Sequence, residues 1–192
     1  MRLTVCLTVC LTVSAAVLAT PPAEAFADGG HSEQALFELV DAAAQRLQTA
    51  DPVAATKWLS GAAITDPQRV AQVLTAVSED AESQGLPAAY VSRVFGDQID
   101  ASEAVQYSRF SWWKLDPAAA PSVAPDLDTS RSQIDALNRR IVGEIAEQWP
   151  VLHSPGCPAD LDAAKSAVAG ARQLDPLHRQ ALDTATRSYC AA

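Results

Sequence analysis

Four basic residues fall where the pattern of apolar residues predicts an inward-facing position on a helix. Arg46 lies three residues after Ala43 and seven after Leu39, on the apolar stripe of one predicted helix. Lys57 lies eleven residues after Arg46. Eleven residues make about three turns plus 20° of an α-helix, so both side chains would project in one direction from a continuous helix. Arg69 and Arg131 each lie in the first turn of a later predicted helix. These positions predict a set of cations that converges on the interior.

Two uncharged polar residues extend this set. Ser102 and Gln106 are four residues apart and continue an apolar helical stripe formed by Val91, Phe95 and Ile99. For any single basic residue the simpler interpretation is a surface position, because Lys and Arg stems lie along apolar surface and keep their charged ends in water. Only the combination of several such residues on inward-facing positions indicates a binding site.

Several inward-facing cations need counter-charge, because an unpaired buried charge costs a great deal of free energy. Asp66 or Glu103 could supply it, and otherwise the carboxylates belong to a ligand. Arginine binds carboxylates through pairs of parallel hydrogen bonds, and helical bundles form ligand sites from side chains on facing helices. The set predicts a pocket for a small dianion.

The composition excludes other kinds of site. With 23 acidic and 14 basic residues the chain carries a formal charge of −9, whereas binding to nucleic acid or anionic lipid needs concentrated Lys and Arg. No glycine pattern of a dinucleotide-binding or P-loop site occurs. The three histidines, at positions 31, 153 and 178, do not have metal-ligand spacing. We therefore predict no nucleic-acid partner, metal or cofactor.

The elements that position these residues are predicted to be helices throughout, because no segment alternates apolar and polar residues as a half-buried strand does. Asp-Pro pairs that begin at positions 51, 66 and 175 are typical of helix starts, although the first pair could instead kink the helix that contains Arg46. A proline-rich loop is predicted over 116–128. The predicted helices cover residues 32–50, 66–84, 87–114, 129–149, 158–173 and 175–189. The fold class is thus all-α, a single-domain bundle of about six helices within residues 28–192.

Residues 1–27 are predicted to be an export signal that is cleaved from the mature protein. Arg2 precedes an uncharged stretch over residues 3–19, and two Ala-x-Ala sites follow, of which the second ends at Ala27. A membrane anchor is the alternative, but a seventeen-residue helix spans about 25 Å, less than the roughly 30 Å of a bilayer core. The expected location is secreted or periplasmic, with no membrane attachment after cleavage.

Cleavage would remove Cys6 and Cys10 and leave Cys157 and Cys190. Two cysteines in an oxidising compartment most simply form one disulfide. This disulfide would attach the C-terminal tail to the segment after Trp149, and we expect its role to be structural.

With these residues in place, the sequence resembles the chorismate mutases of the all-helical AroQ type, specifically their exported γ subclass. The resemblance extends over essentially all of residues 28–192. It rests on the spacing Arg46-x10-Lys57-x11-Arg69, followed by a hydroxyl-x3-Gln pair at Ser102 and Gln106. Matching segments lie at 40–47, 50–58, 64–70, 90–99, 107–111, 130–135 and 188–190.

The resemblance implies roles for the polar residues of the pocket. Arg46 and Arg131 would bind the two carboxylates of the substrate, chorismate, and Arg69 would complete the cationic wall. Asp66 would orient Arg69 and the region of the ring hydroxyl. Ser102 would bond a substrate oxygen. The γ subclass also implies a homodimer in which each protomer holds a complete pocket.

Lys57 and Gln106 would lie on either side of the substrate's ether oxygen, and with Arg46 and Arg131 they form the expected catalytic set. Some relatives have Glu where this chain has Gln106, and secreted relatives can carry a polar residue where it has Val73. An amide donates a hydrogen bond at any pH, whereas a carboxylate donates only when protonated. The Val73 difference would weaken ring-side hydrogen bonding without abolishing turnover.

The reaction that the resemblance implies is a unimolecular rearrangement of chorismate to prephenate, which needs no nucleophile, proton transfer or cofactor. Two other functions remain open from the sequence. One is a lyase on the same fold that releases pyruvate from isochorismate. The other is an inactive helical protein that binds a partner, with Trp112 and Trp113 beside the proline-rich loop as a contact surface.

Overall fold

The computed structural model describes residues 35–190, and all of its regular structure is helical. The elements are α2 (Phe37–Gln48), α3 (Ala50–Ser60), α4 (Pro67–Ser83), α5 (Ala88–Leu115), the 3-10 turn η1 (Pro117–Ala119), α6 (Leu127–Glu147), α7 (Trp149–Leu152), α8 (Cys157–Ala171) and α9 (Pro176–Ala185). No strand occurs among residues 35–190, so the all-α prediction is confirmed. No helix of this range is both long and apolar enough to cross a membrane. The predicted export signal, residues 1–27 with Cys6 and Cys10, lies outside the described residues.

Aspartate side chains cap the start of three helices. The carboxylates of Asp66, Asp126 and Asp175 accept hydrogen bonds from the backbone N–H groups three residues further on, at 3.1, 3.1 and 2.8 Å. Such caps satisfy N–H groups that have no acceptor inside the helix. The helix starts predicted from the Asp-Pro pairs at 66 and 175 are therefore confirmed.

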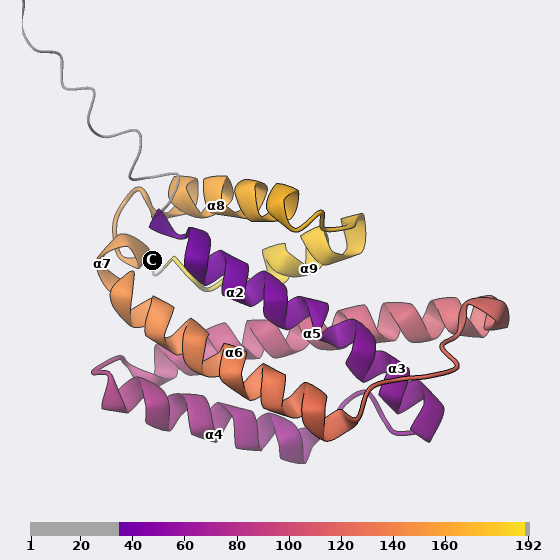
Figure 1. The fold of residues 1–192 in the computed structure, drawn as a ribbon. Helices are drawn as coiled ribbons and strands as arrows, with labels where there is room; N and C mark the ends of the chain where they lie inside the picture. Colours follow the sequence, from indigo (N-terminus) through magenta and orange to yellow (C-terminus); the bar gives the residue numbers. More distant parts are fainter. Residues whose placement is uncertain (1–34, 191–192) are drawn as a thin grey trace, which may run out of the picture.

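The first Asp-Pro pair behaves differently. Of the two alternatives, a second helix does start here, but it begins at Ala50 with Thr49 as its N-cap, so Asp51 is not the cap that an Asp-Pro helix start implies. Thr49 keeps helical backbone angles, and its hydroxyl donates to the Arg46 carbonyl at 2.6 Å. Asp51 instead accepts two hydrogen bonds from Arg109 of α5, at 2.7 and 3.0 Å. The backbone therefore stays close to helical at Thr49, and α3 follows α2 end to end (Figure 1).

The remaining differences lie at helix ends. α6 begins at Leu127 rather than near Thr129, and α9 ends at Ala185 rather than near Tyr189. The short helix α7 was not predicted, and it begins where the preceding helix was expected to end. Pro150 is compatible with this helix because it lies in the first turn, where its missing N–H has no helical acceptor to lose. The described residues thus contain more helices than the predicted six.

Helix α5 crosses the bundle and contacts helices on several sides (Figure 1). It packs against α9, α4 and α3, while α2 packs against α6, α8 and α9, and α4 also contacts α6. The predicted apolar stripe of α5 is fully buried at Val91, Val94 and Phe95. This packing brings the faces of α2 and α5 that carry Arg46 and Ser102 to the same interior region.

The segment that contains Tyr189 and Cys190 is attached to this core by a disulfide and by hydrogen bonds. A disulfide joins Cys157, at the start of α8, to Cys190, which confirms the predicted pair. The adjacent Tyr189 is fully buried, and its hydroxyl accepts a hydrogen bond from the Gln98 amide of α5 at 2.9 Å. The Tyr90 hydroxyl donates to the Tyr189 carbonyl at 2.5 Å. The disulfide therefore fixes a segment whose Tyr189 side chain is part of the buried core.

We predict that replacing both disulfide cysteines with alanine lowers the free energy of unfolding by about 3 to 4 kcal/mol, the chain-entropy cost of releasing a loop of this length. The bridged residues are 33 positions apart. Denaturant unfolding of the oxidised wild type and of the Cys157→Ala/Cys190→Ala variant gives the difference. Reductant serves as the control, because it should lower the stability of the wild type and leave the variant unchanged. Equal stability of the two oxidised proteins would contradict the structural role.

Candidate active site

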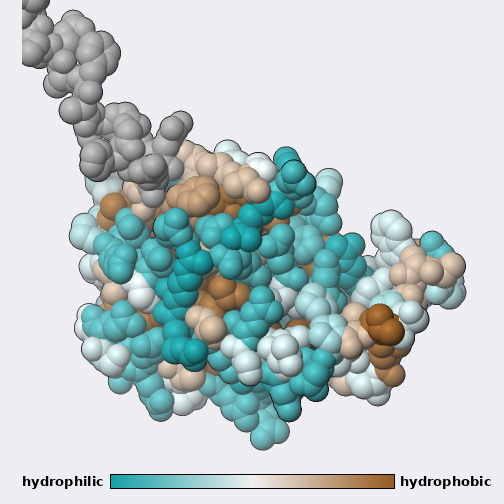
Figure 2. Space-filling view, viewed as in Figure 1, coloured by the Kyte–Doolittle hydropathy of each residue, from teal (hydrophilic) through white to brown (hydrophobic). Residues whose placement is uncertain are grey.

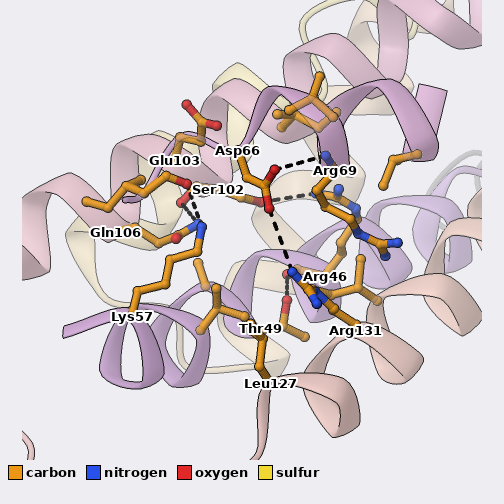
Figure 3. Close-up of a pocket in the computed structure, with 17 residues that line it drawn as sticks. Arg46, Thr49, Lys57, Asp66, Arg69, Ser102, Glu103, Gln106, Leu127 and Arg131 are labelled. Carbon is orange, nitrogen blue, oxygen red and sulfur yellow. Dashed lines mark hydrogen bonds and ion pairs between the residues drawn. The ribbon is translucent and has the colours of Figure 1, made fainter. Parts of the chain in front are cut away.

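A pocket opens among α2, α3, α4, α5 and α6, and it contains all of the site residues expected from the sequence (Figure 3). Its volume is about 700 Å³ with the open mouth included. The predicted site residues that line it are Arg46, Lys57, Asp66, Arg69, Ser102, Gln106 and Arg131. The other lining residues are Thr49, Ala50, Val53, Ile64, Val70, Val73, Ile99, Glu103, Leu127 and Ile134. Five helices thus contribute cationic, neutral polar and apolar side chains to one cavity.

Arg46 lies at the inner end of the pocket and is only 4% exposed. Its Nε donates to Asn138 Oδ1 at 2.8 Å, and its Nη1 donates to the Gln98 carbonyl and the Ser102 hydroxyl, both at 3.0 Å. Burial lowers the pKa of Arg46 to about 10. That value is far above neutral pH, so the group is a cation with a fixed orientation.

Lys57 reaches the pocket from α3. Its Nζ donates to the Ile64 carbonyl at 2.5 Å. Burial lowers the pKa of Lys57 below its usual value and outweighs the opposing attraction of Glu103 and Asp66. Figure 3 shows Lys57, Glu103 and Gln106 toward one end of the pocket in that view and the three arginines toward the other.

Asp66 connects the start of α4 to α6. Its Oδ1 caps α4 through the backbone N–H of Arg69, and its Oδ2 lies 3.7 Å from Arg131 Nη2. Asp128 provides a second carboxylate at 3.6 Å from Arg131. The expectation that Asp66 orients Arg69 holds only for its backbone, because the Arg69 guanidinium instead pairs with Asp135 of α6 at 2.5 Å.

Ser102 and Gln106 lie one turn apart on α5, as expected. The Ser102 hydroxyl accepts from Arg46 and donates to the Gln98 carbonyl at 2.9 Å. Gln106 is 5% exposed, and its Nε2 donates to the Ser102 carbonyl at 3.2 Å. Its buried Oε1 has no hydrogen-bond partner among residues 35–190. Val73 is also buried and contributes to the apolar lining.

Two residues of α6 that hold the cations were not identified from the sequence. Asp135 pairs with Arg69, and Asn138 binds Arg46. They follow Arg131 by four and seven residues and so share one face of α6 with it. This spacing was the available signal, and it acquires meaning only when α6 is known to lie beside α2 and α4.

The arrangement is suited to binding and stabilising negative charge. Four cations surround a space with an apolar lining, where weak solvent screening strengthens their interaction with an anion. A hydroxyl and an amide add neutral polar groups. Within the described range no group of His, Cys, Asp and Glu side chains could hold a metal ion. A small organic dianion fits this set of groups.

Known proteins have similar sequences and a similar fold. Residues 37–107 match the family model described as chorismate mutase type II. A secreted chorismate mutase of Mycolicibacterium smegmatis is 62% identical over 155 residues, which cover 81% of this chain and 86% of the relative. One of Mycobacterium tuberculosis is 55% identical over 157 residues, 82% of this chain and 79% of the relative. The crystal structure of a chorismate mutase from Burkholderia phymatum superimposes with a TM-score of 0.81 at 34% identity, and covers 85% of this chain and all of that one.

Proposed function

Because this chain belongs to the secreted AroQ chorismate mutases, we propose that its pocket among α2 to α6 binds chorismate and converts it to prephenate. The observation that carries the proposal is the convergence of Arg46, Lys57, Arg69 and Arg131 on one cavity that also contains Ser102 and Gln106. Chorismate carries two carboxylates, and three arginines at one end of the pocket supply matching positive charge.

Positioning is the first contribution that such a pocket makes. The reaction joins two ends of one molecule, so the enzyme must hold the compact conformer in which the reacting carbons approach each other. In the proposed complex Arg46 and Arg131 bind the two carboxylates, and Arg69 adds to the cationic wall. Ser102, whose hydroxyl already contacts Arg46, bonds a substrate oxygen near that end. Asp66 remains the partner of Arg131 and orients its guanidinium.

Charge stabilisation is the second contribution. As the C–O bond breaks, the ether oxygen becomes more negative, and a fixed cation stabilises this state more than the ground state. Lys57 and Gln106 are proposed to bond that oxygen from two sides. Both side chains are attached to helices and have backbone carbonyl acceptors, Ile64 for Lys57 and Ser102 for Gln106. Little reorganisation is then needed as the charge develops.

We predict that the wild type forms prephenate and that Lys57→Ala lowers kcat by about 10² to 10³, the usual loss for one donor to a developing oxyanion. Loss of chorismate is followed by absorbance, with the products separated. Lys114→Ala, an exposed lysine near the end of α5, is the matched control and should keep full activity. Both proteins should give the wild-type circular dichroism spectrum.

Other results would support the alternative functions. No turnover by a folded, oxidised wild type would favour an inactive binding protein. Pyruvate released from isochorismate, without prephenate from chorismate, would favour the lyase.

A second prediction concerns Gln106. In Gln106→Glu the side chain can donate to the ether oxygen only when it is protonated, so the variant should be slower than the wild type at neutral pH and improve as the pH falls. Gln106→Leu removes the donor at every pH and should be slow with a flat profile. Rates of all three proteins across pH 4 to 8 test this. A flat profile for Gln106→Glu would contradict the role assigned to Gln106.

We also propose that the protein is exported with cleavage after Ala27 and that it forms a homodimer with one pocket in each protomer. The relatives are named as secreted. Exposed apolar side chains occur toward the ends of α3 and α5 and in the loop that follows, and Figure 2 shows hydrophobic atoms on the projecting tip at the right. The larger ones there are Leu59, Tyr107, Trp112, Leu115 and Val123. Such side chains lose contact with water when a partner covers them.

Native mass spectrometry of the exported protein tests both proposals in one measurement. We expect a dimer whose subunits begin at Asp28, and Leu115→Asp should shift it toward monomer if the tip is the interface. A monomer at micromolar concentration would contradict the dimer. Subunits that retain residues 1–27 would contradict cleavage.

A further inference from the structure

The Arg46 guanidinium is held by neutral acceptors alone. Its partners are the Asn138 amide oxygen, the Gln98 carbonyl and the Ser102 hydroxyl. Within residues 35–190 no carboxylate oxygen lies within 4.0 Å of it. Its Nη2 makes no hydrogen bond to any described residue and belongs to a side chain that lines the pocket. Arg46 therefore keeps both its full charge and a free donor.

The other two arginines of the wall are different. Arg69 is paired with Asp135 at 2.5 Å, and Arg131 has Asp66 and Asp128 at 3.7 and 3.6 Å. A nearby carboxylate offsets much of the field that an arginine exerts on a ligand anion. Arg46 is thus the arginine of the pocket with no carboxylate of residues 35–190 within 4.0 Å, and it is also the most buried of the three.

Asn138 is the residue that holds the buried Arg46 guanidinium in place without adding a negative charge beside it. It is 5% exposed on α6, and its amide oxygen accepts from Nε at 2.8 Å. It is the single asparagine among the 192 residues of the chain. An aspartate would have the same shape and accept the same hydrogen bond, but it would add a negative charge at the point of contact. Asp135, one turn earlier on the same helix, places such a negative charge beside Arg69.

We propose that Asn138 is a positioning residue that orients Arg46 while leaving its charge available to a substrate carboxylate. The inference rests on the proposed function, since it assigns to Arg46 a carboxylate of chorismate. A carboxylate of the substrate has the same charge in the ground state and in the transition state, so this interaction contributes to uniform binding. Disturbing it should raise KM more than it lowers kcat.

The test compares Asn138→Asp with Asn138→Ala. Asp keeps the acceptor and adds a charge, whereas Ala removes the acceptor and adds none. We expect kcat/KM to fall about 100-fold in Asn138→Asp, the effect of two unit charges about 6 Å apart at an effective dielectric constant of about 20. In Asn138→Ala we expect a fall of about 10-fold, as for loss of one hydrogen bond to a charged group. In both variants the change should lie mainly in KM.

The order of activity of the two variants, with Asn138→Asp below Asn138→Ala, distinguishes this proposal from a purely structural role for Asn138. If Asn138 only satisfied a buried arginine, Asp would replace it well and be more active than Ala, and that result would overturn the proposal. Gln133→Glu adds the same charge at an exposed position of α6 and should leave KM unchanged. Unfolding curves show whether each variant is folded.

Two further outcomes are decisive. If Asn138→Asp does not fold, Asn138→Ala alone tests the idea, because a wild-type KM in that variant would overturn it. Absence of chorismate turnover by the wild type would remove the proposed function and this inference with it. Turnover by the wild type with the reverse ranking would remove the inference only.

Discussion

A guanidinium that is almost fully buried must find acceptors within the protein, and Arg46 finds them on two other helices. The Gln98 carbonyl and Ser102 belong to α5 and Asn138 to α6, so α2, α5 and α6 must meet at one point. Leaving such a cation without acceptors would cost more free energy than most packing defects. The apolar packing around α2 and α5 supplies the stability that this arrangement requires.

The charge of the whole chain and the charge of its pocket have opposite signs. At −9 the protein repels a dianion at long range, but at physiological salt this repulsion is screened beyond about 8 Å. Inside the cavity, low exposure to water strengthens the attraction of the four cations. Binding in this pocket therefore depends on short-range contacts and on the exclusion of water rather than on steering by the surface.

Local patterns in the sequence predicted most of the helices, and the spacing of the cations together with the family resemblance predicted polar residues that line the pocket. Asp66 and Asp175 act as caps because the relevant contacts are three residues away. Asp51 carried the same local signal, yet a partner 58 residues away, Arg109, determines its contact. Asn138 and Asp135 were missed for the same reason, since their partners lie 92 and 66 residues away. Packing between helices decides such contacts, and a single sequence does not encode it as a local pattern.

The hydrogen bond between Gln98 and Tyr189 links the disulfide to the inner end of the pocket. The Gln98 backbone carbonyl accepts a hydrogen bond from Arg46, and its side-chain amide donates one to the Tyr189 hydroxyl. These contacts join α2, α5 and the segment that contains Tyr189. Tyr189 is next to Cys190, whose disulfide with Cys157 attaches this segment to the start of α8. The disulfide therefore bears on the pocket through a short series of contacts, from Cys190 to Tyr189, from Tyr189 to Gln98 and from Gln98 to Arg46.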